Sequence, residues 1–135
     1  MGKNKFPKCN RLTNRSDIRM LFQEGSILKL HPCSVFYLQK KKELFLYHKV
    51  LFTVSKRNIR SSVQRNNIKR LLREAYRINK SILDDVVDTT GAKFVFLIGY
   101  VYTGSKEKIH YPILNRAVIK SLQHFRFLLN RELPE

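Results

Sequence analysis

The side chains best suited to chemistry in this sequence are the cations of residues 56–80. This segment holds nine Lys and Arg residues and one acid, Glu74. Four of the cations recur at every fourth position, so on a helix they are neighbours along one edge. This cation row consists of Arg65, Lys69, Arg73 and Arg77. Ammonium and guanidinium groups bind phosphate oxygens, and a guanidinium can do so through two parallel hydrogen bonds. The chemistry indicated is recognition of a polyanion.

The helix that must carry this row has two separate faces. At roughly 100° per residue, its apolar side chains fall within an arc of about 160° and its cations within another arc of about 140°. The apolar arc contains Ile68, Leu71, Leu72, Ala75, Tyr76 and Ile78, and the polar arc contains Arg65, Asn66, Lys69, Arg70, Arg73 and Arg77. The charge of the polar arc therefore has a single sign.

Like charges along the cation row are costly to an isolated helix. Its three neighbouring pairs cost roughly 0.2–0.5 kcal/mol each, or about 1 kcal/mol together. Glu74 can offset only part of this, by pairing with Arg70 or Arg77. Because mixed signs would serve solubility equally well, we interpret the row as an RNA contact rather than a solvated face. Replacing Arg65 and Lys69 with Ala should weaken RNA binding, while stability holds or rises slightly.

Candidates for catalysis or metal binding are weaker. Asp84, Asp85 and Asp88 could hold Mg²⁺, but three acids in a polar loop are more commonly a solvated linker. Cys9 and Cys33 have no metal-ligand spacing to each other or to the four histidines. No Ser-His-Asp arrangement or phosphate-cradling Gly-rich loop is present. The residues alone indicate an RNA-binding module without a catalytic centre of its own.

Composition agrees with this interpretation. The 135 residues are 43% hydrophobic and carry 27 Lys and Arg against 10 Asp and Glu, a formal net charge of +17. Such an excess favours an anionic partner. We expect a single RNA-binding domain, residues 1–135, with a basic N-terminal tail at 1–12. No signal peptide is visible, and the longest apolar run, residues 94–102, is far shorter than the roughly 20 residues of a membrane-spanning helix. The expectation is a soluble, cytoplasmic protein without membrane association.

The elements around the basic helix predict an α+β sandwich. Asn14 or Ser16 could cap a short helix that ends at Gly25. Segments 33–39 and 44–54 favour two strands joined by a charged turn at 40–43. There follow a basic helix over 62–80, an acidic loop over 84–91, a buried strand over 94–102, and a helix from Pro112 to about Asn130 whose inward residues are Leu114, Ala117, Val118, Leu122, Phe125 and Leu129. The helices would cover one mostly antiparallel sheet.

The two strands of the expected hairpin carry four aromatic residues, Phe36, Tyr37, Phe45 and Tyr47. Strand alternation sends some of these rings to the face away from the core. Exposed rings beside cations are typical of surfaces that bind single-stranded nucleic acid, since bases stack on them. For each ring alone a place in the core is the more common outcome, and the sequence does not assign the faces.

Residues 54–77, VSKRNIRSSVQRNNIKRLLREAYR, resemble the signature of the bacterial ribonuclease P protein subunit. In that family a Ser-Lys-basic strand end leads into a helix with Arg-Asn, Ile-Lys-Arg and Leu-x-Arg-Glu. The stretch FPKCNRLTNRSDIRMLFQEG, residues 6–25, is similar to the family's N-terminal segment, and the likeness extends to SLQHF at 121–125.

The resemblance implies a fold in more detail than the residues do. It implies a two-layer sandwich of three helices on a four-stranded mixed sheet, in the order α-β-β-β-α-β-α, like the second domain of a small-subunit ribosomal protein. It also implies a left-handed β-α-β crossover, although about 98% of such connections are right-handed.

The resemblance also implies a function. The family's protein joins a large catalytic RNA, and the holoenzyme hydrolyses precursor tRNA to remove its 5′ leader. The expected partners are ribonuclease P RNA and precursor tRNA, with no role for DNA, and Mg²⁺ bound mainly by the RNA would support hydrolysis. The alternative is a basic ribosomal or other structural RNA-binding protein without a role in cleavage.

The family's site residues carry over to matching positions of this chain. Expected RNA-binding residues are Ser55, Lys56, Arg57, Arg65, Asn66, Lys69, Arg70, Arg73 and Arg77. Expected residues of the cleft for the single-stranded leader are Ile18, Phe22 and Phe36. Three departures stand out: Asn67 replaces a usual second Arg, Ile18 replaces a usual aromatic residue, and residues 58–62 lack a Gly seen in many members. No catalytic residue is expected in this chain.

Overall fold

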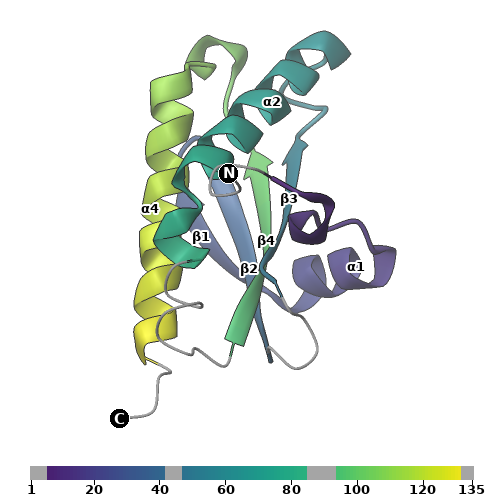
Figure 1. Ribbon diagram of the computed structural model, residues 1–135. Coiled ribbons are helices and arrows are strands. Elements are labelled where there is room, and N and C mark those ends of the chain that lie inside the picture. Colours follow the sequence, from purple (N-terminus) through teal and green to yellow (C-terminus); the bar gives the residue numbers. More distant parts are fainter. Residues whose placement is uncertain (1–5, 42–46, 85–93, 132–135) are drawn as a thin grey trace.

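The computed structural model describes residues 6–41, 47–84 and 94–131. Their strands form one sheet, and helices pack on it (Figure 1). In chain order the elements are η1 (Lys8–Asn10), α1 (Arg15–Glu24), β1 (Ser26–Leu30), β2 (Cys33–Lys41), β3 (Lys49–Val54), α2 (Ser62–Asn79), β4 (Phe94–Tyr102), η2 (Lys106–Lys108) and α4 (Tyr111–Arg131). The expected α+β class is confirmed, and so are the basic helix, the buried strand and the last helix.

The sheet has the strand order β1-β2-β4-β3. Strands β1, β2 and β4 are antiparallel neighbours, whereas β3 runs parallel to β4, so α2 forms the crossover between them. In Figure 1 both of these strands run upward, β4 lies to the left of β3, and α2 lies in front of the sheet. A crossover with this arrangement is left-handed, as the family resemblance implied.

The hairpin expected between segments 33–39 and 44–54 is wrong. Strand β4 lies between β2 and β3, and Lys40 and Lys41 belong to β2 instead of a turn. The rest of that turn lies outside the described residues. The reason is that β4 is buried along nearly its whole length and therefore takes an interior place in the sheet, with β2 on one side and β3 on the other. Strand β1, with its alternating exposure, was not predicted from the residues alone.

The main core lies between the sheet and the helices α2 and α4. Strand alternation sends Val35 of β2, Phe52 of β3 and Phe96 of β4 to this side. All six residues predicted to face inward from α4 are buried here: Leu114, Ala117, Val118, Leu122, Phe125 and Leu129. Tyr37 also packs on this side, with its ring centroid 5.2 Å from that of Phe125.

The opposite face of the sheet carries α1 over a smaller cluster, in which Leu12, Leu21 and Leu97 are buried. Asn14 caps this helix by accepting a hydrogen bond from the Asp17 backbone N–H at 3.0 Å, and the helix ends before Gly25, as expected. Gly99 of β4 lets α1 approach closely. A Cβ atom there would lie 3.1 Å from Leu21 Cδ2 and 3.3 Å from the Phe22 ring.

The chain start is packed on the protein as far as it is described. Phe6 is only 9% exposed and lies against the rings of Phe52 and Tyr76, with centroid distances of 5.8 and 5.7 Å. The Leu12 backbone N–H donates to Val50 O of β3 at 3.0 Å. The expected basic tail at 1–12 is therefore wrong for residues 6–12, because their apolar side chains complete both clusters. Residues 1–5 lie outside the described residues.

Candidate nucleic-acid interface

Helix α2 buries one face and exposes its cations. Ser61 caps it by accepting a hydrogen bond from the Gln64 backbone N–H at 3.3 Å. Ile68, Leu72, Ala75 and Tyr76 are buried in the main core. Ile78, assigned to the apolar face from the sequence, is 43% exposed, because it lies at the margin of that arc near the helix end. The cation row is on the outside, and no aspartate of the described residues covers it.

Two members of the cation row are engaged within the protein. Arg65 Nη1 donates to the carbonyl oxygens of Ile59 and Arg60, at 2.9 and 2.7 Å. This side chain therefore fastens the turn that precedes α2. Arg77 donates to both carboxylate oxygens of Glu74, at 3.0 and 2.5 Å, which lowers the pKa of that carboxyl. Glu74 thus pairs with Arg77 of its two possible partners.

The remaining cations of α2 are available to an anion. Arg70 is exposed, and its guanidinium donates to Asn67 Oδ1 at 2.7 Å. The residue that departs from the family pattern therefore orients a neighbouring guanidinium. Lys69 is partly exposed and pairs with no carboxylate of the described residues. Asn66 is exposed beside it on the same helix.

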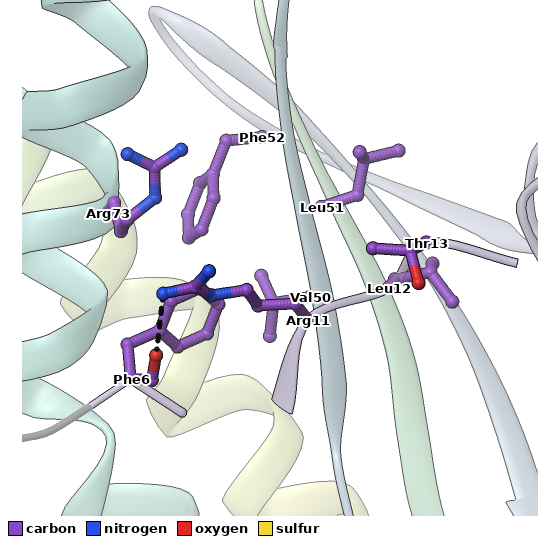
Figure 2. Close-up of a pocket in the computed structure, with 8 residues that line it drawn as sticks. All are labelled: Phe6, Arg11, Leu12, Thr13, Val50, Leu51, Phe52 and Arg73. Carbon is purple, nitrogen blue, oxygen red and sulfur yellow. Dashed lines mark hydrogen bonds between the residues drawn. The ribbon is translucent and has the colours of Figure 1, made fainter. Parts of the chain in front are cut away.

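Arg73 takes part in a pocket of about 340 Å³ at the outer edge of β3, the β3-edge pocket. Its guanidinium lies over the Phe52 ring, 5.9 Å from the centroid. Arg11 lies over the Phe6 ring at 5.5 Å and donates to Phe6 O at 3.2 Å. Figure 2 shows both guanidinium groups beside these rings, with Leu51 and Thr13 on the other side of β3. Arg11 was not among the site residues predicted from the sequence. Only its place before Leu12, in the segment 6–25 that is similar to the family's N-terminal segment, could have indicated it.

The turn before α2 is held by backbone and side-chain hydrogen bonds. Ser55 donates its backbone N–H to Tyr102 O at 3.3 Å and accepts from Ile59 N at 3.1 Å. The Asn58 side chain donates to Thr103 O, which joins this turn to the one after β4. With Arg65 these bonds fix a turn that lacks the family's Gly. Lys56 and Arg57 are exposed on it, and Arg57 lines a hollow of about 540 Å³.

The three residues expected at the leader cleft lie together on the α1 side of the sheet. The rings of Phe22 and Phe36 are 4.8 Å apart in an edge-to-face arrangement, and Ile18 packs on the same small cluster. All three are partly exposed. Tyr37 faces the main core instead, as strand alternation requires. Tyr47 is 51% exposed, and Phe45 lies outside the described residues.

The described residues offer little to catalysis by the protein itself. No three His, Cys, Asp or Glu side chains among them come close enough to share a metal ion. Asp84 lies 4.0 Å from Lys80 Nζ in a helical stretch, and Asp85 and Asp88 lie outside the described residues. Burial raises the pKa of Cys33 to about 12, so its thiol is not a nucleophile at neutral pH. Among the helices described, none has the length and apolarity to span a membrane.

Comparison with known proteins identifies the family. The family profile of ribonuclease P matches residues 6–126. The ribonuclease P protein component of Porphyromonas gingivalis is 35% identical over 117 residues, covering 85% of this chain and 82% of that protein. The chain belongs to the ribonuclease P protein family. The ribonuclease P protein component of Chlorobaculum tepidum is 29% identical over 137 residues, covering 98% of this chain and 88% of its own.

Solved ribonuclease P proteins share the fold. The protein from Staphylococcus aureus aligns with a TM-score of 0.59 at 17% identity, covering 93% of this chain and 98% of that one. The protein from Thermotoga maritima gives 0.63 at 21% identity, covering 84% and 96%. The family and fold expected from residues 54–77 are thus confirmed. Proteins of this family are components of ribonuclease P, the endoribonuclease of tRNA processing. The RNA contacts assigned to single residues remain predictions.

Proposed function

We propose that this chain is the protein component of a ribonuclease P ribonucleoprotein and binds its catalytic RNA through α2 and the turn before it. The observation that carries the proposal is the exposed single-sign surface of α2, where Lys69 and Arg70 form no ion pair with a carboxylate of the described residues. Phosphates brought to this surface replace the missing counter-charges. The cost of crowding cations on one helix edge is then offset in the complex.

We further propose that the 5′ leader of precursor tRNA lies along the α1 side of the sheet. Phe22 and Phe36 present partly exposed rings there, and unpaired bases stack on such rings. The cations of the β3-edge pocket would meet the phosphates of the same strand, because that pocket reaches around β3 to Leu51 and Thr13. The protein contributes binding and orientation of the substrate in this scheme.

Catalysis is assigned to the RNA. Mg²⁺ bound mainly by the RNA would supply Lewis-acid and nucleophile activation for phosphodiester hydrolysis. The described residues of this chain do not fit a protein-held Mg²⁺ site, since their carboxylates do not form a cluster. We therefore assign no step to a metal held by the protein. The cations of the protein instead lower the electrostatic repulsion between the precursor tRNA and the catalytic RNA.

The decisive experiment is single-turnover cleavage of a precursor tRNA by the cognate ribonuclease P RNA at modest Mg²⁺ concentration, with and without this protein. Addition of the protein should restore removal of the 5′ leader. The rival function, a ribosomal or other structural RNA-binding protein, predicts RNA binding with no gain in cleavage. Lys69→Ala with Arg70→Ala should reduce the gain and flatten the salt dependence of RNA binding by roughly 0.7–0.9 in log–log slope per lost contact.

Leader recognition has its own control pair. Phe22→Ala should weaken binding of a leader-bearing precursor to the holoenzyme by roughly 10-fold, because one stacked base is worth about 1–3 kcal/mol. Mature tRNA, which lacks the leader, should bind unchanged. Phe127→Ala removes a ring that is 57% exposed on α4 and should affect neither RNA. Equal losses for both substrates would remove the leader from the α1 side of the sheet.

A further inference from the structure

A second basic hollow lies at the other edge of the sheet, between β1 and α4. Its volume is about 320 Å³. Its lining residues are Lys29, Leu30, His31, Ile113, Arg116, Ala117 and Lys120. Lys29 and Leu30 are the last residues of β1, and His31 lies in the turn to β2. The remaining lining residues belong to the first half of α4. We call this the β1–α4 hollow. Neither the resemblance nor the proposed function uses it.

The charge of the hollow has one sign. Lys29, Arg116 and Lys120 are exposed, no acid lines the hollow, and none of the three pairs with a carboxylate of the described residues. Arg116 and Lys120 are one helical turn apart, the like-charge spacing that makes the cation row of α2 costly. A charged residue such as Lys29 on an edge strand already serves to discourage pairing with another sheet. That explanation does not extend to the two cations of α4.

The walls of the hollow indicate what it can bind. Leu30, Ile113 and Ala117 are aliphatic, and the imidazole of His31 is the one aromatic ring among the lining residues. Bases therefore find a single imidazole to stack on, whereas phosphate oxygens find three cations. The hollow fits a nucleic-acid backbone bound mainly through its charge, as in contacts to helical RNA.

The hollow lies at the edge of the sheet opposite the β3-edge pocket. Strand β1 is three strand spacings from β3, or about 14 Å across the sheet, and α4 covers the β1 side. A backbone that follows the β3-edge pocket therefore runs along the opposite edge of the sheet. We propose that the β1–α4 hollow binds the phosphodiester backbone of a second RNA segment within the same ribonucleoprotein. This inference rests on the proposed function, because that function supplies the RNA.

The test compares two double variants in α4. Arg116→Ala with Lys120→Ala removes the α4 cations of the hollow. Arg126→Ala with Arg131→Ala removes the same charge from exposed positions about 15 Å further along the helix. The affinity of each full-length protein for the cognate ribonuclease P RNA is measured across a series of KCl concentrations. The first variant should lose roughly 1.4–1.8 in log–log slope, the effect of two phosphate contacts, and the second should match the wild type.

Footprinting assigns the contact to a segment. Hydroxyl-radical protection of the RNA should be lost by the first variant at nucleotides that differ from those lost by Lys69→Ala with Arg70→Ala. Arg116→Lys with Lys120→Arg should restore both slope and protection. Equal slopes for the two α4 variants, or loss of protection at the α2 nucleotides only, would overturn the inference. Failure of the proposed function is a different result, since wild-type protein would then give no gain in cleavage by the cognate RNA.

Discussion

Both edges of the sheet carry positive charge, but the cations at the two edges contact different groups of the protein. At the β3 edge, Arg73 and Arg11 lie over the rings of Phe52 and Phe6, and Arg65 is bonded to backbone carbonyls. At the β1 edge, Arg116 and Lys120 stand over aliphatic walls without a carboxylate partner among the described residues. A cation count alone would treat these surfaces as equivalent. The cations of the β3 edge also stabilise the fold through their rings and carbonyl partners, whereas those of the β1 edge serve only a ligand.

The largest expected effect comes from removing the aromatic support at the β3 edge. Phe52 packs against Phe6, Tyr76 and Tyr100, with centroid distances of 5.8, 6.1 and 5.6 Å. Phe52→Ala should therefore lower the free energy of unfolding by about 3 kcal/mol. Leu30→Ala at the β1 edge should cost less than about 2 kcal/mol, since Leu30 is only partly buried. Urea unfolding followed by circular dichroism measures both, and equal losses would contradict the distinction between the two edges.

A smaller effect is expected from removing single cations. Arg65→Ala should lower the free energy of unfolding by about 1–2 kcal/mol, because two backbone carbonyls lose a charged donor. Arg116→Ala should leave it unchanged or slightly raised, because it relieves repulsion with Lys120. The same urea experiment compares them. If Arg65→Ala proved as stable as Arg116→Ala, the bonds to the turn before α2 would not be structural.

The smallest effect concerns the one acid on α2. Arg77 lowers the pKa of Glu74 from its ordinary value of 4.5, so the pair stabilises the folded chain at neutral pH and this contribution disappears as the pH falls through the lowered pKa. Glu74→Gln should therefore be slightly less stable than wild type at pH 7, and the difference should vanish in acid. Thermal unfolding from pH 7 to pH 3 provides the measurement. A difference in stability between the two proteins that grew in acid would contradict the lowered pKa of Glu74.

The same substitution has a second consequence. It releases Arg77 for RNA, so the affinity of Glu74→Gln for the cognate RNA should equal or exceed that of wild type. Lower affinity would indicate that the ion pair itself orients the contact. Lys69→Gln is the matched control, because it removes one cation from the same face without freeing another and should weaken binding.

The sequence was sufficient where a pattern is local. The two faces of α2, the buried residues of α4 and the cap at Asn14 follow from periodicity and side-chain type, and they agree with the structure except at the exposed Ile78. Strand partners do not follow in this way, since β4 comes late in the chain yet lies between β2 and β3. Only the family resemblance supplied the fourth strand and the handedness of the crossover.

The sequence predicted where the residues of the candidate site lie in the fold, but not what each of their side chains contacts. Residues 55–57 and the cations of α2 lie where expected. The sequence argument that replacing Arg65 would relieve repulsion did not foresee its bonds to the carbonyls of Ile59 and Arg60. Such bonds depend on how a turn folds back toward a helix, which residue spacing does not encode. Arg11 was missed for a similar reason, because its place beside Phe6 depends on tertiary packing.

The unequal size of the two hydrophobic clusters has a consequence for motion. Helix α1 is attached through the small cluster of Leu12, Leu21 and Leu97, whereas α2 and α4 share the main core. Partial opening of a native protein begins where the least apolar surface is buried. Amide protons of α1 should therefore exchange with solvent by lifting of that helix alone, while those of β4 wait for global unfolding. The side of the sheet that carries Phe22 and Phe36 can thus adjust to an incoming strand without disturbing the support of the α2 cations.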